Sequence, residues 1–170
     1  VDQDPHFRIT RDIAPKINKT KPALIHNIMI PSLSGPGGKM SASDEKNTIY
    51  TTDSPEVVKK KINKYAFSGG QSDIDEHRKI GGNPDIDVSY QYLRIFFERD
   101  DSKLKKIYDD YKSGKMLTGE LKAILIEKIN EFLLVHQQKR EEARKNIDDY
   151  LLKDWSVQIL SVRTNMNLKS

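Results

Sequence analysis

Beyond residue 54, apolar residues recur every three or four positions, which is the spacing of one buried helix face. Val58, Ile62 and Ala66 define the first such face, and further helices are predicted near 73–79, 88–96, 104–111 and 118–150. The last helix has the longest stripe, formed by Leu121, Leu125, Ile129, Phe132, His136, Arg140, Ala143, Ile147, Tyr150 and Leu151. Because no strand pattern interrupts residues 54–150, this part predicts a helical bundle.

The first fifty residues show a different pattern. Residues 1–3 read as the end of a strand, and Asp4 with Pro5 predicts a helix that starts there and runs to about residue 17. The apolar run 23–30, between two prolines, predicts a buried strand of a parallel sheet. Residues 48–51 predict a brief further strand.

A strand, a helix, a strand and a Gly-rich loop together predict the second half of a Rossmann-like nucleotide-binding fold, whose ligands bind at the carboxyl ends of strands. The predicted fold class is therefore α/β plus all-α, mostly α overall. We expect residues 1–52 to form the C-terminal half of the Rossmann-like domain. Residues 53–170 should form a helical domain with a C-terminal tail.

Composition limits the possible functions. A net charge of +4 and a pI near 9.1 allow a polyanionic partner without requiring one. The absence of cysteine excludes a disulfide framework and a cysteine-ligated metal. No apolar run approaches the ~20 residues of a membrane span, and the first residues do not resemble a signal peptide, so we expect a cytoplasmic protein. The histidines form no ligand cluster, and no metal site is predicted; they are His6, His26, His77 and His136.

The segment 34–43 combines glycines and serines with Lys39. A lysine ammonium can balance the charge that develops on a departing pyrophosphate, and serine hydroxyls add directed donors. Glycines let a backbone approach phosphate closely. Met40 follows Lys39, which excludes a Walker A loop. On this segment alone, a solvated Gly/Ser loop is an equally good interpretation.

Three more blocks accompany Lys39-Met40-Ser41-Ala42-Ser43 in a fixed order. They are Asp2–Arg8 with Thr10–Pro15, then Ala66–Gly70 with Glu76–Arg78 and Gly81–Ser89, and finally Ser113–Lys122. In this order the blocks resemble tryptophanyl-tRNA synthetases of the eukaryotic cytosolic type, over roughly residues 1–150. These are class I enzymes whose KMSKS signature occurs here as KMSAS. Their second signature, HIGH, has no match, so we expect a C-terminal portion of a longer protein.

The resemblance implies roles for individual residues. Lys39, Ser41 and Ser43 would be catalytic, and Ile28, Met29 and Met40 would join Lys39 and Ser41 in binding ATP. Gln3, with Asp2, would bind tryptophan; a turn-stabilising polar pair is the alternative for these two. The anticodon candidates are Gln71, Ser72, Arg78 and Lys122. Human-like members of the family carry charged residues around 71–72, so this chain departs from them at Gln71 and Ser72. Ala42 stands where the commoner KMSKS signature has a second lysine.

The resemblance also implies ATP and Mg²⁺ as cofactors, tryptophan and tRNA(Trp) as substrates, and a homodimer as the whole enzyme. Two alternatives stay open. A tyrosyl-tRNA synthetase shares the fold and the loop chemistry. A non-catalytic tRNA-binding fragment would also carry the helical half without needing the Lys39 segment.

Overall fold

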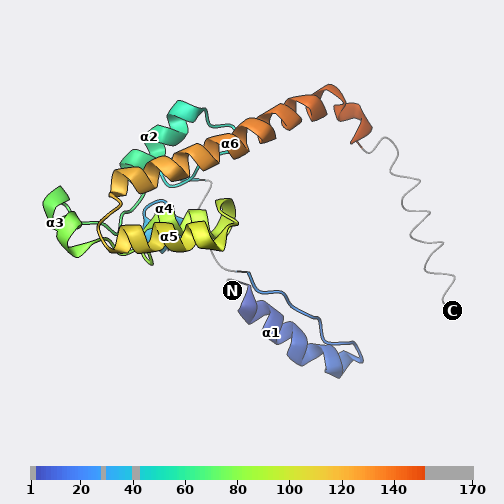
Figure 1. The fold of residues 1–170 in the computed structure, drawn as a ribbon. Helices are drawn as coiled ribbons and strands as arrows, with labels where there is room; N and C mark the ends of the chain where they lie inside the picture. The colour runs from blue at the N-terminus through green and yellow to red at the C-terminus, as the bar shows by residue number, and fades with distance from the viewer. Residues whose placement is uncertain (1–2, 28–29, 40–42, 152–170) are drawn as a thin grey trace. The chain divides into compact units, whose positions relative to one another are not determined.

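The computed structural model describes residues 3–27, 30–39 and 43–151. They divide into two compact units, residues 1–130 and the residues from 131 onward. Helices dominate both units (Figure 1). The α-helices are α1 (Asp4–Ile13), α2 (Pro55–Tyr65), α3 (Ile74–Ile80), α4 (Val88–Tyr92), α5 (Asp101–Lys112) and α6 (Thr118–Lys145). Helix α4 continues as a π-helical turn over Leu93–Phe97, and 3-10 turns cover Ala14–Ile17 and Ile147–Asp149.

The N-terminal helix forms where it was predicted, but Gln3 rather than Asp4 occupies the capping position. Asp4 lies in the first turn and pairs with Arg8 at 2.7 Å, one helical turn away. Helix α1 ends at Ile13, and the predicted continuation to residue 17 is a 3-10 turn. Pro15 explains the change, because it has no N–H for an α-helical hydrogen bond.

The buried strand predicted at 23–30 is absent over 23–27, and residues 28–29 lie outside the described part. Ile25 is 92% exposed. A buried parallel strand needs neighbours that share its hydrogen bonds, and the only sheet among the described residues is a two-stranded hairpin. The strand predicted at 48–51 is likewise wrong, because these residues form an irregular segment. The Lys61 ammonium holds that segment by donating to the Thr48 carbonyl at 2.9 Å.

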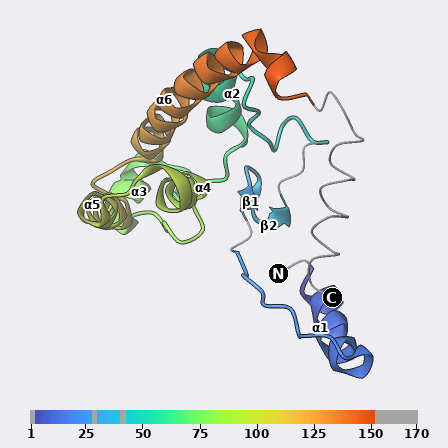
Figure 2. The same ribbon diagram turned by 90° about the vertical axis from the view of Figure 1, so that its right-hand side faces the viewer.

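The hairpin consists of β1 (Pro31–Ser32) and β2 (Gly35–Lys39), which lie side by side in Figure 2. The strands are antiparallel, with Pro31 opposite Lys39 and Ser32 opposite Gly35. Gly35 has φ +122°, a conformation that side-chain-bearing residues rarely adopt. The expected Gly-rich loop therefore begins as a short ribbon that ends at Lys39.

The predicted helices 54–66 and 73–79 are confirmed as α2 and α3. Ser54 caps α2 by accepting from Val57 N–H, with Pro55 in the first turn. Val58 and Ile62 are buried as predicted. Lys61 of α2 is largely buried, because its ammonium pairs with Asp53 at 2.7 Å. Aspartates cap the next helices in the same way, at positions 73, 87 and 100.

The predicted long helix is α6, which begins at Thr118 and ends at Lys145. At its start the Glu120 carboxylate accepts from Leu117 N–H at 2.6 Å. The predicted stripe holds at Leu121, Leu125 and Ile129, which are buried. It fails at Phe132, which is 53% exposed, whereas the neighbouring Leu133 is 5% exposed. Across the described ranges, no helix is both long enough and apolar enough to cross a membrane.

Candidate functional site

The backbone of Lys39 ends strand β2, directly opposite Pro31. Ser43, the last residue of the Lys39 segment, is exposed. Gln3 is exposed immediately before α1, and its side chain does not cap that helix. The remaining predicted nucleotide and tryptophan residues lie outside the described residues; these are Asp2, Ile28, Met29, Met40 and Ser41.

The turn of the Lys39 hairpin packs against the helical part of residues 1–130. Leu33, in the turn of the hairpin, is fully buried, and its carbonyl accepts from Phe67 N–H at 2.7 Å. A Cβ on Gly35 would lie 3.3 Å from the Phe67 ring, so the backbone of β2 passes close to that side chain. The segment predicted to bind phosphate is thus supported by residues that follow α2.

A buried polar cluster lies behind the residues predicted to contact RNA. The Asp87 carboxylate is fully buried and accepts from Gly69 N–H at 2.9 Å, Ser89 N–H at 2.8 Å and the Tyr111 hydroxyl at 2.8 Å. The Tyr111 and Thr118 hydroxyls are 3.1 Å apart. Burial, reinforced by the Asp87 charge, raises the pKa of Tyr111 to about 12, so the phenol remains a donor at neutral pH.

His77 links two loops through its two ring nitrogens. Its Nδ1 accepts from Gln71 N–H at 3.3 Å, and its Nε2 lies 3.0 Å from the Met116 carbonyl. This pattern requires the neutral ring with its proton on Nε2. The ring also contacts Tyr111, with centroids 5.2 Å apart. A Cβ on Gly70 would lie 2.9 Å from His77 Nδ1, which explains glycine at this position.

Two of the predicted anticodon residues, Gln71 and Ser72, line a cavity of about 380 Å³ between the start of α3 and the start of α6. The other lining residues are Asp73, Ile74, His77, Leu117, Thr118, Gly119 and Glu120. The Gln71 amide donates to the Gly81 carbonyl at 3.1 Å. Both Gln71 and Ser72 remain exposed. Gln71 and Ser72 therefore lie at the surface of a cavity whose lining also includes His77 and Thr118.

Arg78, the third predicted anticodon residue, has a structural role. Its Nη1 donates to the Gly114 carbonyl at 3.0 Å and also to the Lys115 carbonyl. Gly114 has φ +78° in the turn between α5 and α6. The guanidinium thus satisfies two carbonyl groups of the turn that follows α5.

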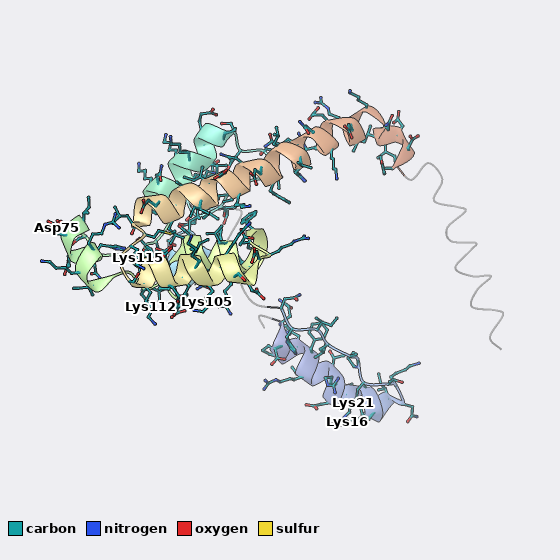
Figure 3. All side chains as sticks on the ribbon, in the orientation of Figure 1. Lys16, Lys21, Asp75, Lys105, Lys112 and Lys115 are labelled. Carbon is teal, nitrogen blue, oxygen red and sulfur yellow. The ribbon has the colours of Figure 1, made fainter. Side chains whose placement is uncertain are left out.

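Lys122, the fourth, is the fifth residue of α6 and donates to the Asn63 carbonyl at 3.3 Å. Partial burial lowers the pKa of its ammonium, and the charge of Asp87 partly opposes this effect. Other cations lie at the surface: Figure 3 shows Lys105, Lys112 and Lys115 projecting from α5 and the turn after it. Lys122 therefore differs from them, being a half-buried cation close to a buried carboxylate.

Sequence reasoning missed the positions that hold this region together. The sequence indicates Asp87, Tyr111 and His77 only as parts of a motif or of a predicted helix. A usable signal existed for Asp87, because an aspartate directly before the apolar helix 88–96 is a typical cap. No sequence signal pointed to its contact with Tyr111, which lies 24 residues away. Among the described residues, no three His, Asp or Glu side chains are grouped to hold a metal ion.

The chain combines a hairpin that ends at Lys39 with a helical part, and residues 1–134 match the family model described as tRNA synthetases class I (W and Y). The chain belongs to this family. Its similar relatives are tryptophan–tRNA ligases. The enzyme of Sulfurisphaera tokodaii is 60% identical over 148 residues, covering 87% of this chain and 39% of the relative. The cytoplasmic enzyme of Saccharomyces cerevisiae is 50% identical over 153 residues, covering 89% and 35%.

Solved structures of synthetases also match this chain. A tryptophanyl-tRNA synthetase from Aeropyrum pernix matches with a TM-score of 0.79 and 38% identity, over 85% of this chain and 40% of that one. A tyrosyl-tRNA synthetase from the same organism matches with a TM-score of 0.61 and 24% identity, over 78% and 40%, which shows a shared fold alone. The chain thus spans about two-fifths of the length of the proteins that it matches.

Proposed function

We propose that this chain is part of a tryptophan–tRNA ligase, which activates tryptophan with ATP and transfers it to tRNA(Trp). The observation that carries the proposal is 60% identity to such a ligase across a segment with an intact Lys39-Met40-Ser41-Ala42-Ser43 sequence. Tyrosine as the substrate is less well supported, because the tyrosyl-tRNA synthetase match rests on 24% identity. The relatives named cytoplasmic support a cytoplasmic location.

In this proposal, the nucleotide-binding half is residues 1–52 and the helical RNA-binding half is residues 53–170. Lys39 stabilises the charge that develops on pyrophosphate as the tryptophan carboxylate attacks the α-phosphate. Ser41 and Ser43 donate hydrogen bonds to the phosphates, and Met40 packs the loop. Since Ala42 replaces the second lysine of the commoner signature, Lys39 provides the one cation within 39–43.

The other proposed contacts follow the same division. Ile28 and Met29 bind the adenine, and Gln3, oriented by Asp2, accepts from the tryptophan ammonium. Mg²⁺, when bound with the triphosphate, would neutralise phosphate charge. The whole enzyme is proposed to be a homodimer.

The RNA surface proposed here is the mouth of the cavity lined by Gln71 and Ser72, together with Lys122 and Arg78. Exposed polar groups above a rigid base suit the recognition of unstacked anticodon bases. Arg78 contributes mainly by holding the turn at Gly114, because its Nη1 is already hydrogen-bonded.

The deciding experiment is ATP–pyrophosphate exchange by the full-length enzyme. We expect exchange that depends on tryptophan and does not respond to tyrosine. Exchange that responds to tyrosine would replace the proposed substrate. If no exchange occurs with either amino acid while tRNA binding is retained, the chain belongs to a non-catalytic RNA-binding protein.

A separate prediction concerns Lys122. Replacing it with alanine should weaken tRNA binding about tenfold. It should also reduce the slope of log K against log salt concentration by about one. The reason is that a partly desolvated ammonium attracts phosphate more strongly than a fully solvated one. Filter binding at several salt concentrations measures both effects. Lys105→Ala is the matched control, since Lys105 is exposed and already paired with Asp109 at 2.6 Å. Equal losses in the two variants would contradict a specific role for Lys122.

A further inference from the structure

Tyr92 lies at the end of α4, yet its hydroxyl reaches the Lys39 hairpin. Its Oη donates to the Pro31 carbonyl at 2.8 Å. Pro31 is the residue directly opposite Lys39 in the β1–β2 pair. One hydrogen bond therefore connects a helix of the bundle to the strand position that faces Lys39.

The hairpin depends on such outside support. Strand β1 has only two residues, and the pairing is irregular between Pro31 and Ser32. A two-stranded ribbon of this size has little stability of its own. Proline has no N–H, so the Pro31 carbonyl is the one main-chain group through which this residue can be hydrogen-bonded.

Tyr92 is suited to give this support. Its side chain is 3% exposed, and its ring meets the Phe96 ring edge-on with centroids 6.0 Å apart. Burial raises the pKa of the Tyr92 hydroxyl well above its usual range, so it remains a donor throughout the working pH range. The π-helical turn that follows, Leu93–Phe97, places both rings on neighbouring positions of one continuous helix.

We propose that Tyr92 is a positioning residue for adenylate formation, which fixes the Lys39 hairpin against the helical bundle through the Pro31 carbonyl. This role rests on the proposed ligase function and extends it. The Phe67–Leu33 hydrogen bond supports the turn of the hairpin, whereas Tyr92 supports the end where Lys39 lies. A small displacement of a charge-stabilising group is costly to catalysis even when the fold is retained.

The test is Tyr92→Phe in the full-length enzyme, which removes the hydroxyl and keeps the ring. We expect ATP–pyrophosphate exchange to lose about tenfold in kcat/KM for ATP, with the KM for tryptophan unchanged. Hydrogen–deuterium exchange should become faster at residues 31–39 and stay the same in α5 and α6. Tyr108→Phe is the matched control, because the Tyr108 hydroxyl donates to exposed Asp85 at 3.1 Å, and it should leave both measurements unchanged.

Each other outcome overturns the proposal. Wild-type kinetics in Tyr92→Phe would show that the hydroxyl does not position the hairpin for catalysis. Equal losses for ATP and tryptophan, with faster hydrogen exchange throughout, would indicate a purely structural tyrosine. A wild-type enzyme without tryptophan-dependent exchange would overturn the ligase function itself, and the role of Tyr92 with it.

Discussion

Replacing Lys39 with alanine should reduce the kcat of tryptophan-dependent ATP–pyrophosphate exchange by about 100- to 1,000-fold. The physical reason is the loss of a cation where negative charge develops on the leaving pyrophosphate. The effect should be large because Ala42 leaves no second lysine within 39–43 to substitute for Lys39. The KM for tryptophan should hardly change, since the amino-acid contacts proposed for Gln3 do not involve this loop.

The control for this prediction is Lys46→Ala in the turn that follows the loop. Lys46 is exposed, and its backbone N–H, which alanine retains, donates to Asp44 at 3.0 Å. Exchange by this variant should match the wild type. A second variant, Lys39→Arg, separates charge from shape, and partial activity is expected because a guanidinium retains the charge in another geometry. If Lys39→Ala kept wild-type exchange, Lys39 would have no part in adenylate formation.

The sequence predicted the helical part well because its signals are local. Periodicity located α2 through Val58 and Ile62, and the buried half of α6 through Leu121, Leu125 and Ile129. Each of these features depends on residues within two turns of one another. Phe132 shows the limit of such reasoning, because the periodic stripe continues to Phe132 whereas the buried position of the helix is the next residue, Leu133.

Residues 1–52 were predicted less well, since their structure depends on partners distant in sequence. The apolar run around Ile25 has the composition of a buried strand, but composition cannot provide neighbouring strands. Tyr92 contacts Pro31 and Phe67 contacts Leu33 of the hairpin, and these partners lie 61 and 34 positions apart in the chain. No periodicity reveals such pairs, and the predicted roles of Lys39, Gln3 and the anticodon residues therefore remain predictions.

The largest expected effect on stability comes from Asp87→Ala. The substitution should lower the free energy of unfolding by about 3–5 kcal/mol, because it leaves several buried donors without an acceptor. These donors are Gly69 N–H, Ser89 N–H and the Tyr111 hydroxyl, all within 2.9 Å of the carboxylate. The same substitution removes the cap of α4. Urea denaturation followed by circular dichroism measures the change.

Asp85→Ala is the control, two residues away. Asp85 is exposed, and its side chain accepts one hydrogen bond, from Tyr108, so the change should stay within about 0.5 kcal/mol. A double variant with Tyr111→Phe tests the network directly. Once Tyr111 has lost its hydroxyl, removing Asp87 should cost less than it does in the wild type, because one of the abandoned donors is gone. Strictly additive losses would mean that the two side chains stabilise the fold independently, and equal losses for Asp87→Ala and Asp85→Ala would contradict the buried cluster as the support of this face.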